Sequence, residues 1–196
     1  MIFRPLRSLY DWVLSWAHHT HAQTALFALA FAEASFFPIP PDVLLIAIAL
    51  GLPKRAFRFA AIATVGSVLG GLAGYAIGHG LMASVGQRIL DFYHLHAQFD
   101  RIRELYLQYD VWAVGVAGFT PIPYKVFTIA AGAFDMDPVR FTLASIISRG
   151  ARFFLVAGLI YLYGAAIKGF IDRYFNLLTV IFTALLVGFF FVLAYL

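Results

Sequence analysis

The stretch SFFPIPPDVLL, residues 35–45, and the stretch GFTPIPYKVFT, residues 118–128, decide the fold. Both place Pro-Ile-Pro inside an apolar segment, and the second copy follows the first by 83 residues. Proline removes a backbone donor and ends or kinks a helix, so each copy divides an apolar segment into two short arms. Soluble proteins put such breaks in polar surface turns. These two are predicted to lie in apolar surroundings.

The composition is that of an integral membrane protein. Of the 196 residues, 62% are apolar and 12% charged, and the mean hydropathy is +0.85. Soluble domains are about half apolar and about a quarter charged, and this chain would expose large apolar patches in water. We expect one all-α membrane domain that comprises residues 1–196.

Two classes of protein are disfavoured by the residues that the chain contains. It has no cysteine, so disulfides and thiolate metal sites are excluded. The net charge of +4 comes from scattered residues rather than from a basic stripe, so we predict no nucleic-acid partner. The histidines have no carboxylates at the spacing that metal sites use, so we predict neither a metal nor a cofactor.

The first proline site predicts a re-entrant hairpin, which enters and leaves the membrane on one side. Its breaks are Pro38, Pro40 and Pro41, and its arms are 22–37 and 42–52. As helices the arms would span about 24 Å and about 16 Å at 1.5 Å per residue, which is less than the hydrocarbon core of about 30 Å. Irregular backbone at that depth needs protein or a wet cavity around it.

The second site repeats this pattern, with arms 111–120 and 124–134 around Pro121 and Pro123. "RF" also recurs, at Arg58-Phe59 and 82 residues later at Arg140-Phe141. With one crossing between them, the two hairpins would enter from opposite faces, which is the inverted-repeat plan of many transporters. A chance likeness of two apolar segments is the alternative. Full crossings are expected near 57–80, 139–167 and 174–196.

These predictions divide the domain into five segments. They are an N-terminal interfacial helix (1–20), repeat one (22–80), an amphipathic linker (81–110), repeat two (111–167) and a C-terminal crossing (174–196). In the linker, Leu95, Phe99, Ile102 and Tyr106 are predicted to share one helical face.

The distribution of basic residues predicts the orientation. Seven of them would share one side, against four on the other, which carries six acids. The positive-inside rule then places the N-terminus in the cytoplasm and the protein in the inner (plasma) membrane. The seven are Arg4, Arg7, Lys54, Arg55, Arg58, Lys168 and Arg173, and the four are Arg88, Arg101, Arg103 and Arg140.

Five ionisable residues fall at membrane depth: Glu33, Asp42, Lys125, Arg149 and Arg152. Each costs roughly 2.5–3.5 kcal/mol there by insertion scales, so each needs a reason. Lys125 occupies the repeat position equivalent to Asp42, and the two arginines, three residues apart, share a helical face. Two acids and three bases leave one positive charge, which suits a phosphate head group.

Two other interpretations of these charges stay open. They could only neutralise one another and hold the hairpins together, or Glu33 could carry a proton, as proton coupling requires. An exchange of Asp42 with Lys125 would distinguish a scaffold from an anion transporter, because a scaffold tolerates the exchange and a transporter does not.

The stretch GSVLGGLAGYAIG places Gly66, Gly70, Gly74 and Gly78 at intervals of four. Small residues at this spacing make a flat face that another helix approaches closely. We assign them to helix packing rather than to ligand binding. Such faces also allow a homodimer without requiring one.

Together these motifs resemble the DedA family, whose shared region is the VTT or SNARE-associated domain. FAEASFFPIPPDVLL is similar to its Glu-containing, proline-rich motif, and GFTPIPYKVFTIAAG and SRGARFF are similar to its YqaA-like branch. The resemblance implies an inner-membrane protein with two opposed re-entrant hairpins, and its essential acids would fall on Glu33 and Asp42. A better-known branch has two arginines near the second hairpin, where this chain has Gly118 and Lys125.

That family is linked to the movement of undecaprenyl phosphate or phospholipids across membranes. We therefore expect a flippase or scramblase of a phosphate-bearing lipid, with protons as a coupling ion. A non-transporting assembly or stress-tolerance factor is the main alternative. A membrane lipid phosphatase is less favoured, because Ser148 in SRGAR has no base identifiable from the sequence and there is no cysteine nucleophile.

Overall fold

The computed structural model describes residues 21–37, 39–120, 122–164 and 166. All regular secondary structure in these residues is helical, which confirms the all-α class. The predicted interfacial helix (1–20), the C-terminal crossing (174–196), Pro38 and Pro121 lie outside the described residues.

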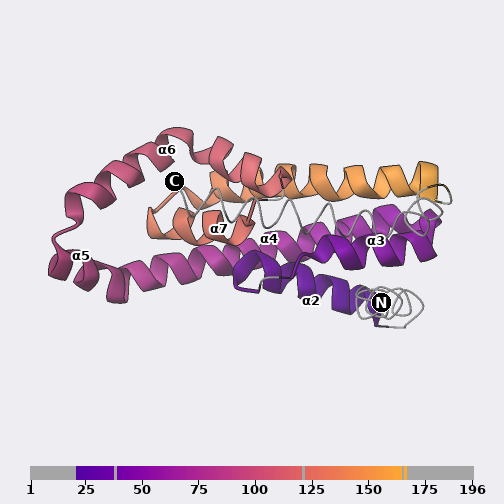
Figure 1. Ribbon diagram of the computed structural model, residues 1–196, viewed down its shortest axis with the longest axis horizontal. Helices are drawn as coiled ribbons and strands as arrows, with labels where there is room; N and C mark the ends of the chain where they lie inside the picture. Colours follow the sequence, from indigo (N-terminus) through magenta and orange to yellow (C-terminus); the bar gives the residue numbers. More distant parts are fainter. Residues whose placement is uncertain (1–20, 38, 121, 165, 167–196) are drawn as a thin grey trace, which may run out of the picture.

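The helices follow one another with short connections (Figure 1). In chain order they are α2 (Ala22–Ser35), α3 (Pro41–Gly51), the 3₁₀ turn η1 (Pro53–Arg55), α4 (Ala56–Leu81), the π-helical turn η2 (Met82–Gly86), α5 (Gln87–Tyr93), α6 (His96–Phe119), α7 (Tyr124–Ala133) and a last helix, Pro138–Gly164.

Both proline sites interrupt the helices as predicted. α2 ends at Ser35, and α3 starts at Pro41, whose fixed φ suits the first helical turn and whose missing N–H costs nothing there. α6 ends at Phe119, and α7 starts after the extended residue Pro123. At each site the two flanking helices run in opposite directions (Figure 1). Re-entry into a membrane and an inverted repeat stay predictions.

Among the residues that the structure describes, two helices are long and apolar enough to cross a membrane. One is the continuous helix Pro53–Tyr93, which contains α4, and the other is Pro138–Gly164. They correspond to the expected crossings near 57–80 and 139–167. The first is longer than expected: its 41 residues would reach about 60 Å, twice the thickness of a hydrocarbon core. α5 therefore extends the helix well past one end of the packed region.

α4 is the helix around which the others pack. A Cβ added at Gly66 or Gly70 would overlap with the backbone of α2, and one added at Gly74 or Gly78 would overlap with α7. The glycine face thus lets the two short helices approach closely enough for backbone to touch backbone, as at Gly78 and the carbonyl of Ile129.

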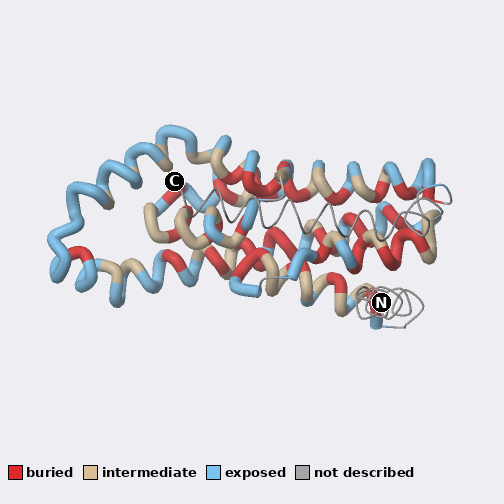
Figure 2. Tube along the Cα trace, viewed as in Figure 1, coloured by how far each residue is buried: buried red, intermediate tan, exposed pale blue. Residues whose placement is uncertain are grey.

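Buried residues line the packed helices along the long axis (Figure 2), and they form two apolar clusters. The first includes Leu26 of α2, Ile48 of α3 and Phe153 of the last helix. The second includes Tyr124 of α7 and Phe141. Between them lies a polar layer, which contains the predicted ionisable residues.

The second proline site differs from the sequence prediction. The arm 111–120 is not a separate short helix, because α6 starts at His96 in the predicted linker and continues without a break to Phe119. Of the residues predicted to share a face of the linker, Ile102 is 57% and Leu95 39% exposed, so burial does not extend over this whole face. Instead Phe99 contacts Phe134, and the Arg103 Nε donates to the Phe134 carbonyl at 3.1 Å.

Candidate functional site: a buried ionic cluster

Glu33 and Arg149 form the deepest ion pair. Arg149 Nη2 donates to Glu33 Oε2 at 2.9 Å, and the two side chains are 3% and 12% exposed. Arg149 Nε donates to Ser67 Oγ of α4 at 2.6 Å. One arginine of the last helix therefore joins α2 to α4 by hydrogen bonds, over sequence separations of 116 and 82 residues.

Two aromatic rings enclose the same guanidinium group. Arg149 Cζ lies 5.0 Å from the centre of the Tyr124 ring and 4.6 Å from that of Phe153. The Tyr124 hydroxyl donates to Ser145 Oγ at 2.5 Å, which fixes the first ring against the last helix. Cation–π contacts of desolvated arginine are worth up to about 2 kcal/mol. Arg149 is thus held by one carboxylate, one hydroxyl and two aromatic rings.

Asp42 and Arg152 form a second, bidentate pair. Arg152 Nε and Nη2 donate to the two oxygens of Asp42, each at 3.0 Å. The remaining nitrogen, Nη1, donates to the backbone carbonyl of Thr120, where α6 has just ended. Arg152 therefore connects the first turn of α3 with the second proline site. These side chains are 16% and 19% exposed, more than the first pair.

Lys125 differs from the two arginines. Its Nζ donates to the backbone carbonyl of Phe37 at 2.9 Å, in the first proline site. Among the residues that the structure describes, no carboxylate lies within 4.0 Å of it. Lys125 also lies in the first turn of α7, where the helix dipole adds positive potential.

All five predicted ionisable residues therefore come to one layer, and both proline sites adjoin it. Pro41 is buried in the first turn of α3, while Pro40 and Pro123 precede α3 and α7. The predicted exchange of Asp42 with Lys125 assumed that these two residues pair. That assumption is wrong, because the partner of Asp42 is Arg152. An exchange that preserves a pair must involve these two residues.

Several residues of the cluster were not found from the sequence. Ser67 lies within the glycine motif and binds Arg149 through its hydroxyl. A polar side chain among small apolar residues was the only feature of the sequence that could have identified it. Tyr124 precedes Lys125, and nothing in its local pattern identifies a ring stacked on an arginine 25 positions later. Thr120 takes part through its carbonyl, which no side-chain motif reports.

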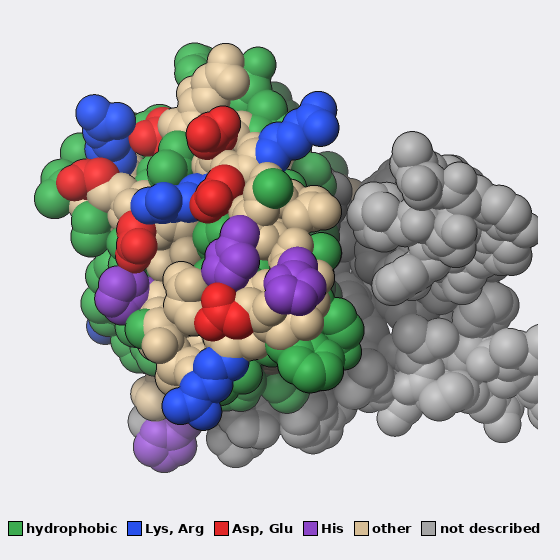
Figure 3. Space-filling model, turned by 90° about the vertical axis from the view of Figure 1, so that its left-hand side faces the viewer, with side chains coloured by type: hydrophobic (Ala, Val, Ile, Leu, Met, Phe, Trp, Pro, Cys, Tyr) green, Lys and Arg blue, Asp and Glu red, His purple; other side chains and the backbone are tan. Residues whose placement is uncertain are grey.

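His79 and His96 form pairs outside this layer. His79 Nδ1 is 2.8 Å from Asp135 Oδ1, and His96 Nε2 is 2.8 Å from Asp91 Oδ1, all largely exposed. Charged and histidine side chains gather on the end of the molecule formed by α5 and the start of α6 (Figure 3). Within the described residues no group of three or more histidine or acidic side chains is arranged to hold a metal ion.

Comparison with known proteins places the chain in a family. The model of the VTT domain matches residues 37–162, which include four of the five ionisable residues. An uncharacterised protein of Haemophilus influenzae is 42% identical over 152 residues, 78% of this chain and 79% of that protein. A homologue from Histophilus somni is 41% identical over the same shares, and a protein of Methanocaldococcus jannaschii is 27% identical over 65% of this chain and 76% of its own length. No solved structure matches. The extent of the domain match and the identity to the Haemophilus protein agree with the motifs, and the chain belongs to the VTT-domain (DedA) family of membrane proteins.

Proposed function

We propose that this protein is a lipid transporter, a flippase or scramblase for a phosphate-bearing lipid such as undecaprenyl phosphate or a phospholipid. One observation carries the proposal: a layer of two acids and three bases lies between two apolar clusters, where both broken helix pairs end. A lipid needs a polar path only for its head group, because its tails stay in the bilayer.

The two ion pairs have different parts in this proposal. Arg149 is bound by Glu33 and Ser67 and lies against two rings, and it therefore holds the helices together. Arg152 and Asp42 are more exposed than the first pair. Lys125 has a neutral backbone carbonyl as its partner, and a phosphate oxygen in its place would give the ammonium group a negatively charged partner. The head group is bound by Lys125 first and then by Arg152, in exchange for the pairing of Arg152 with Asp42.

The transport assay measures this directly. Purified protein in liposomes is expected to move a fluorescent phospholipid or a labelled polyprenyl phosphate between leaflets faster than empty liposomes do. Lys125→Gln is expected to lower the rate at least tenfold, which is about 1.4 kcal/mol of lost interaction with the phosphate in the transition state. The substitution leaves both carboxylates paired, so the fold should persist.

Lys54→Gln is the matched control for this variant. Lys54 is exposed in η1, which follows α3 at the end opposite to Asp42, and the loss of Lys54 removes the same charge from the protein. It should transport at the rate of the unchanged protein. Equal rates for Lys125→Gln and Lys54→Gln would remove Lys125 from the site. No lipid movement by the unchanged protein would reject the transporter itself.

The proposal also includes two re-entrant hairpins that enter from opposite faces, and cysteine labelling tests them. The chain has no cysteine of its own, so single substitutions give clean labels. His21→Cys and Lys54→Cys, at the outer ends of α2 and α3, should react with an impermeant maleimide from one side of the membrane. Gln98→Cys, at the outer end of α6, and Val139→Cys, at the start of the helix that follows α7, should react from the other side.

Labelling of His21→Cys and Lys54→Cys from opposite sides would mean that residues 22–52 cross the membrane completely. Both positions are exposed in the structure, as are Gln98 and Val139, so a lack of access does not obscure the result. A hairpin that crosses would also separate the two proline sites, which the contacts from Lys125 and Arg152 bring together.

A scaffold without transport is the second candidate, and the completeness of the pairing favours it. Each acid has an arginine partner, and Arg149 is 2% exposed. With a pure scaffold, lipids would move between the leaflets no faster than they do in empty liposomes. The phosphatase has less support, because the Ser148 hydroxyl donates to its own helix, to the Ala144 carbonyl at 2.7 Å, rather than to a base.

A further inference from the structure

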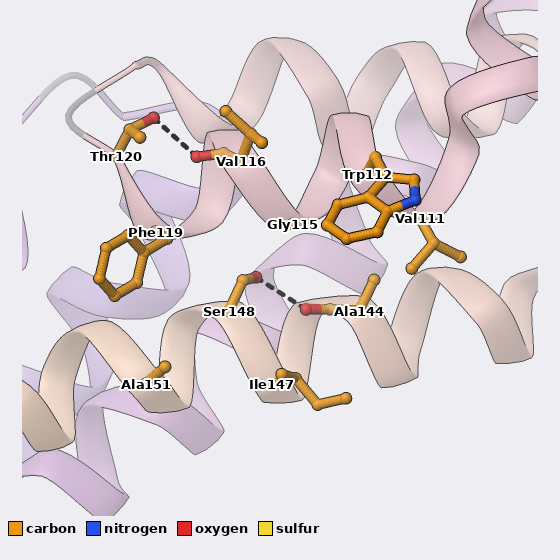
Figure 4. Close-up of a pocket in the computed structure, with 10 residues that line it drawn as sticks. All are labelled: Val111, Trp112, Gly115, Val116, Phe119, Thr120, Ala144, Ile147, Ser148 and Ala151. Atoms are coloured by element: carbon orange, nitrogen blue, oxygen red, sulfur yellow. Dashed lines mark hydrogen bonds between the residues drawn. The ribbon is translucent and has the colours of Figure 1, made fainter.

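A groove of about 400 Å³ lies between α6 and the last helix, beside the ionic cluster. Figure 4 shows the residues that line it, which come from the two facing helices. Trp112, Val116 and Phe119 contribute from α6, and Ala144, Ile147 and Ala151 from the last helix. Trp112 is 75% exposed and Ile147 is 70% exposed, so the groove is open to its surroundings.

The groove presents hydrocarbon rather than hydrogen-bonding groups. Its two hydroxyls are both used within their own helices: Thr120 Oγ1 donates to the Val116 carbonyl at 2.7 Å, and Ser148 Oγ donates to the Ala144 carbonyl at 2.7 Å (Figure 4). A ligand in the groove therefore gains from apolar contact, at about 0.8 kcal/mol for each buried methylene. A head group gains nothing there.

One end of the groove adjoins the cluster. Thr120 lines the groove, and its backbone carbonyl accepts a hydrogen bond from Arg152, which also binds Asp42. From Thr120 the groove follows α6 back to Val111, about 14 Å at 1.5 Å per residue. A chain that fills it thus begins at the charged layer and leads away from it.

Two glycines of α6 explain why this space exists. A Cβ added at Gly118 would overlap with the Ser148 side chain, so the helices touch there. A Cβ added at Gly115, one turn earlier, would meet no atom within 4 Å. The helices therefore meet near the cluster and separate along the groove. Because Gly115 has no side chain, the space beside it stays empty.

Resting on the proposed function, we infer that this groove holds one apolar tail of the transported lipid while Lys125 and Arg152 hold its phosphate. The occupant is therefore a lipid with a phosphate head group and a long hydrocarbon chain. The groove orients the chain so that its polar end lies at the charged layer. Its length selects for a chain rather than for a compact apolar molecule.

Trp112 reports on the occupant by fluorescence. In the full chain with Trp12→Phe and Trp16→Phe, Trp112 is the one remaining tryptophan. In phosphatidylcholine vesicles, phosphatidic acid with brominated tails should quench it at least twofold more than brominated diacylglycerol at the same mole fraction. Lys125→Gln should abolish that difference. Equal quenching by both lipids would indicate ordinary boundary lipid, and no quenching would indicate a second copy or residues 174–196 as the occupant; either result overturns the inference.

Gly115→Phe fills the groove, and Gly158→Phe is its matched control. Gly158 lies in the last helix, is also half-buried, and an added Cβ there meets no atom within 4 Å. Gly115→Phe should abolish the head-group difference in quenching and lower lipid transport at least fivefold, whereas Gly158→Phe should change neither. Transport by Gly115→Phe at the unchanged rate would reject the groove and leave the transporter standing. No transport by the unchanged protein would reject the transporter, and a head-group preference in quenching would still support the groove.

Discussion

Arg149→Met is expected to lower the free energy of unfolding by about 3–5 kcal/mol, the usual cost when one partner of a buried ion pair is removed. The substitution leaves Glu33 charged and without its arginine in a layer between two apolar clusters. It also removes the donor to Ser67 and the cation between two rings. Reversible denaturation with dodecyl sulfate in mixed micelles, followed by circular dichroism, measures this loss.

The double variant Glu33→Leu/Arg149→Met separates the charge effect from the loss of packing. Replacement of a whole buried pair by apolar residues is often neutral or stabilising, so the double variant should regain most of the lost stability. Arg140→Met is the control at a pair whose arginine is 68% exposed, Arg140 and Asp110 at 3.3 Å, and should cost at most about 1 kcal/mol. Equal losses for Arg149→Met and Arg140→Met would contradict a structural role for the deep pair.

The breaks in the helices could be predicted from the sequence because their cause is local. Proline limits its own backbone wherever it stands, and the predicted arms 22–37 and 42–52 differ from α2 and α3 by no more than two residues at any end. The start of the arm 111–120 has no such local cause, because no proline or glycine stands between His96 and Trp112. α6 therefore continues through it.

The partners within the cluster could not be predicted in the same way. The cost of an isolated charge in hydrocarbon shows that Glu33, Asp42 and the bases must meet, but not which acid meets which arginine. That depends on how α2 and α3 pack on α4, where single glycines set the approach of the helices. Lys125 was aligned with Asp42 by repeat position, yet it binds a backbone carbonyl that no sequence pattern marks.

The same dependence on glycine gives the second large effect. Gly78→Val is expected to lower the free energy of unfolding by about 3 kcal/mol, the upper end of the usual cost of overpacking. The added side chain would overlap with the Ile129 carbonyl, and α7 in turn places Gly132 against the carbonyl of Tyr75. Because the obstacle is backbone on both sides, no change of rotamer relieves it, and α7 must move away from α4.

Gly80→Val provides the control two residues further along the same helix. Gly80 is exposed, and an added Cβ meets no atom within 4 Å. Valine forms helix slightly better than glycine, so this variant should gain up to about 0.5 kcal/mol. The two variants are thus expected to shift the denaturation midpoint in opposite directions. A loss at Gly78 as small as the change at Gly80 would mean that α4 and α7 do not touch. Lys125 lies in the first turn of α7, so the packing of α7 on the glycine face of α4 would then not explain why Lys125 lies in the charged layer.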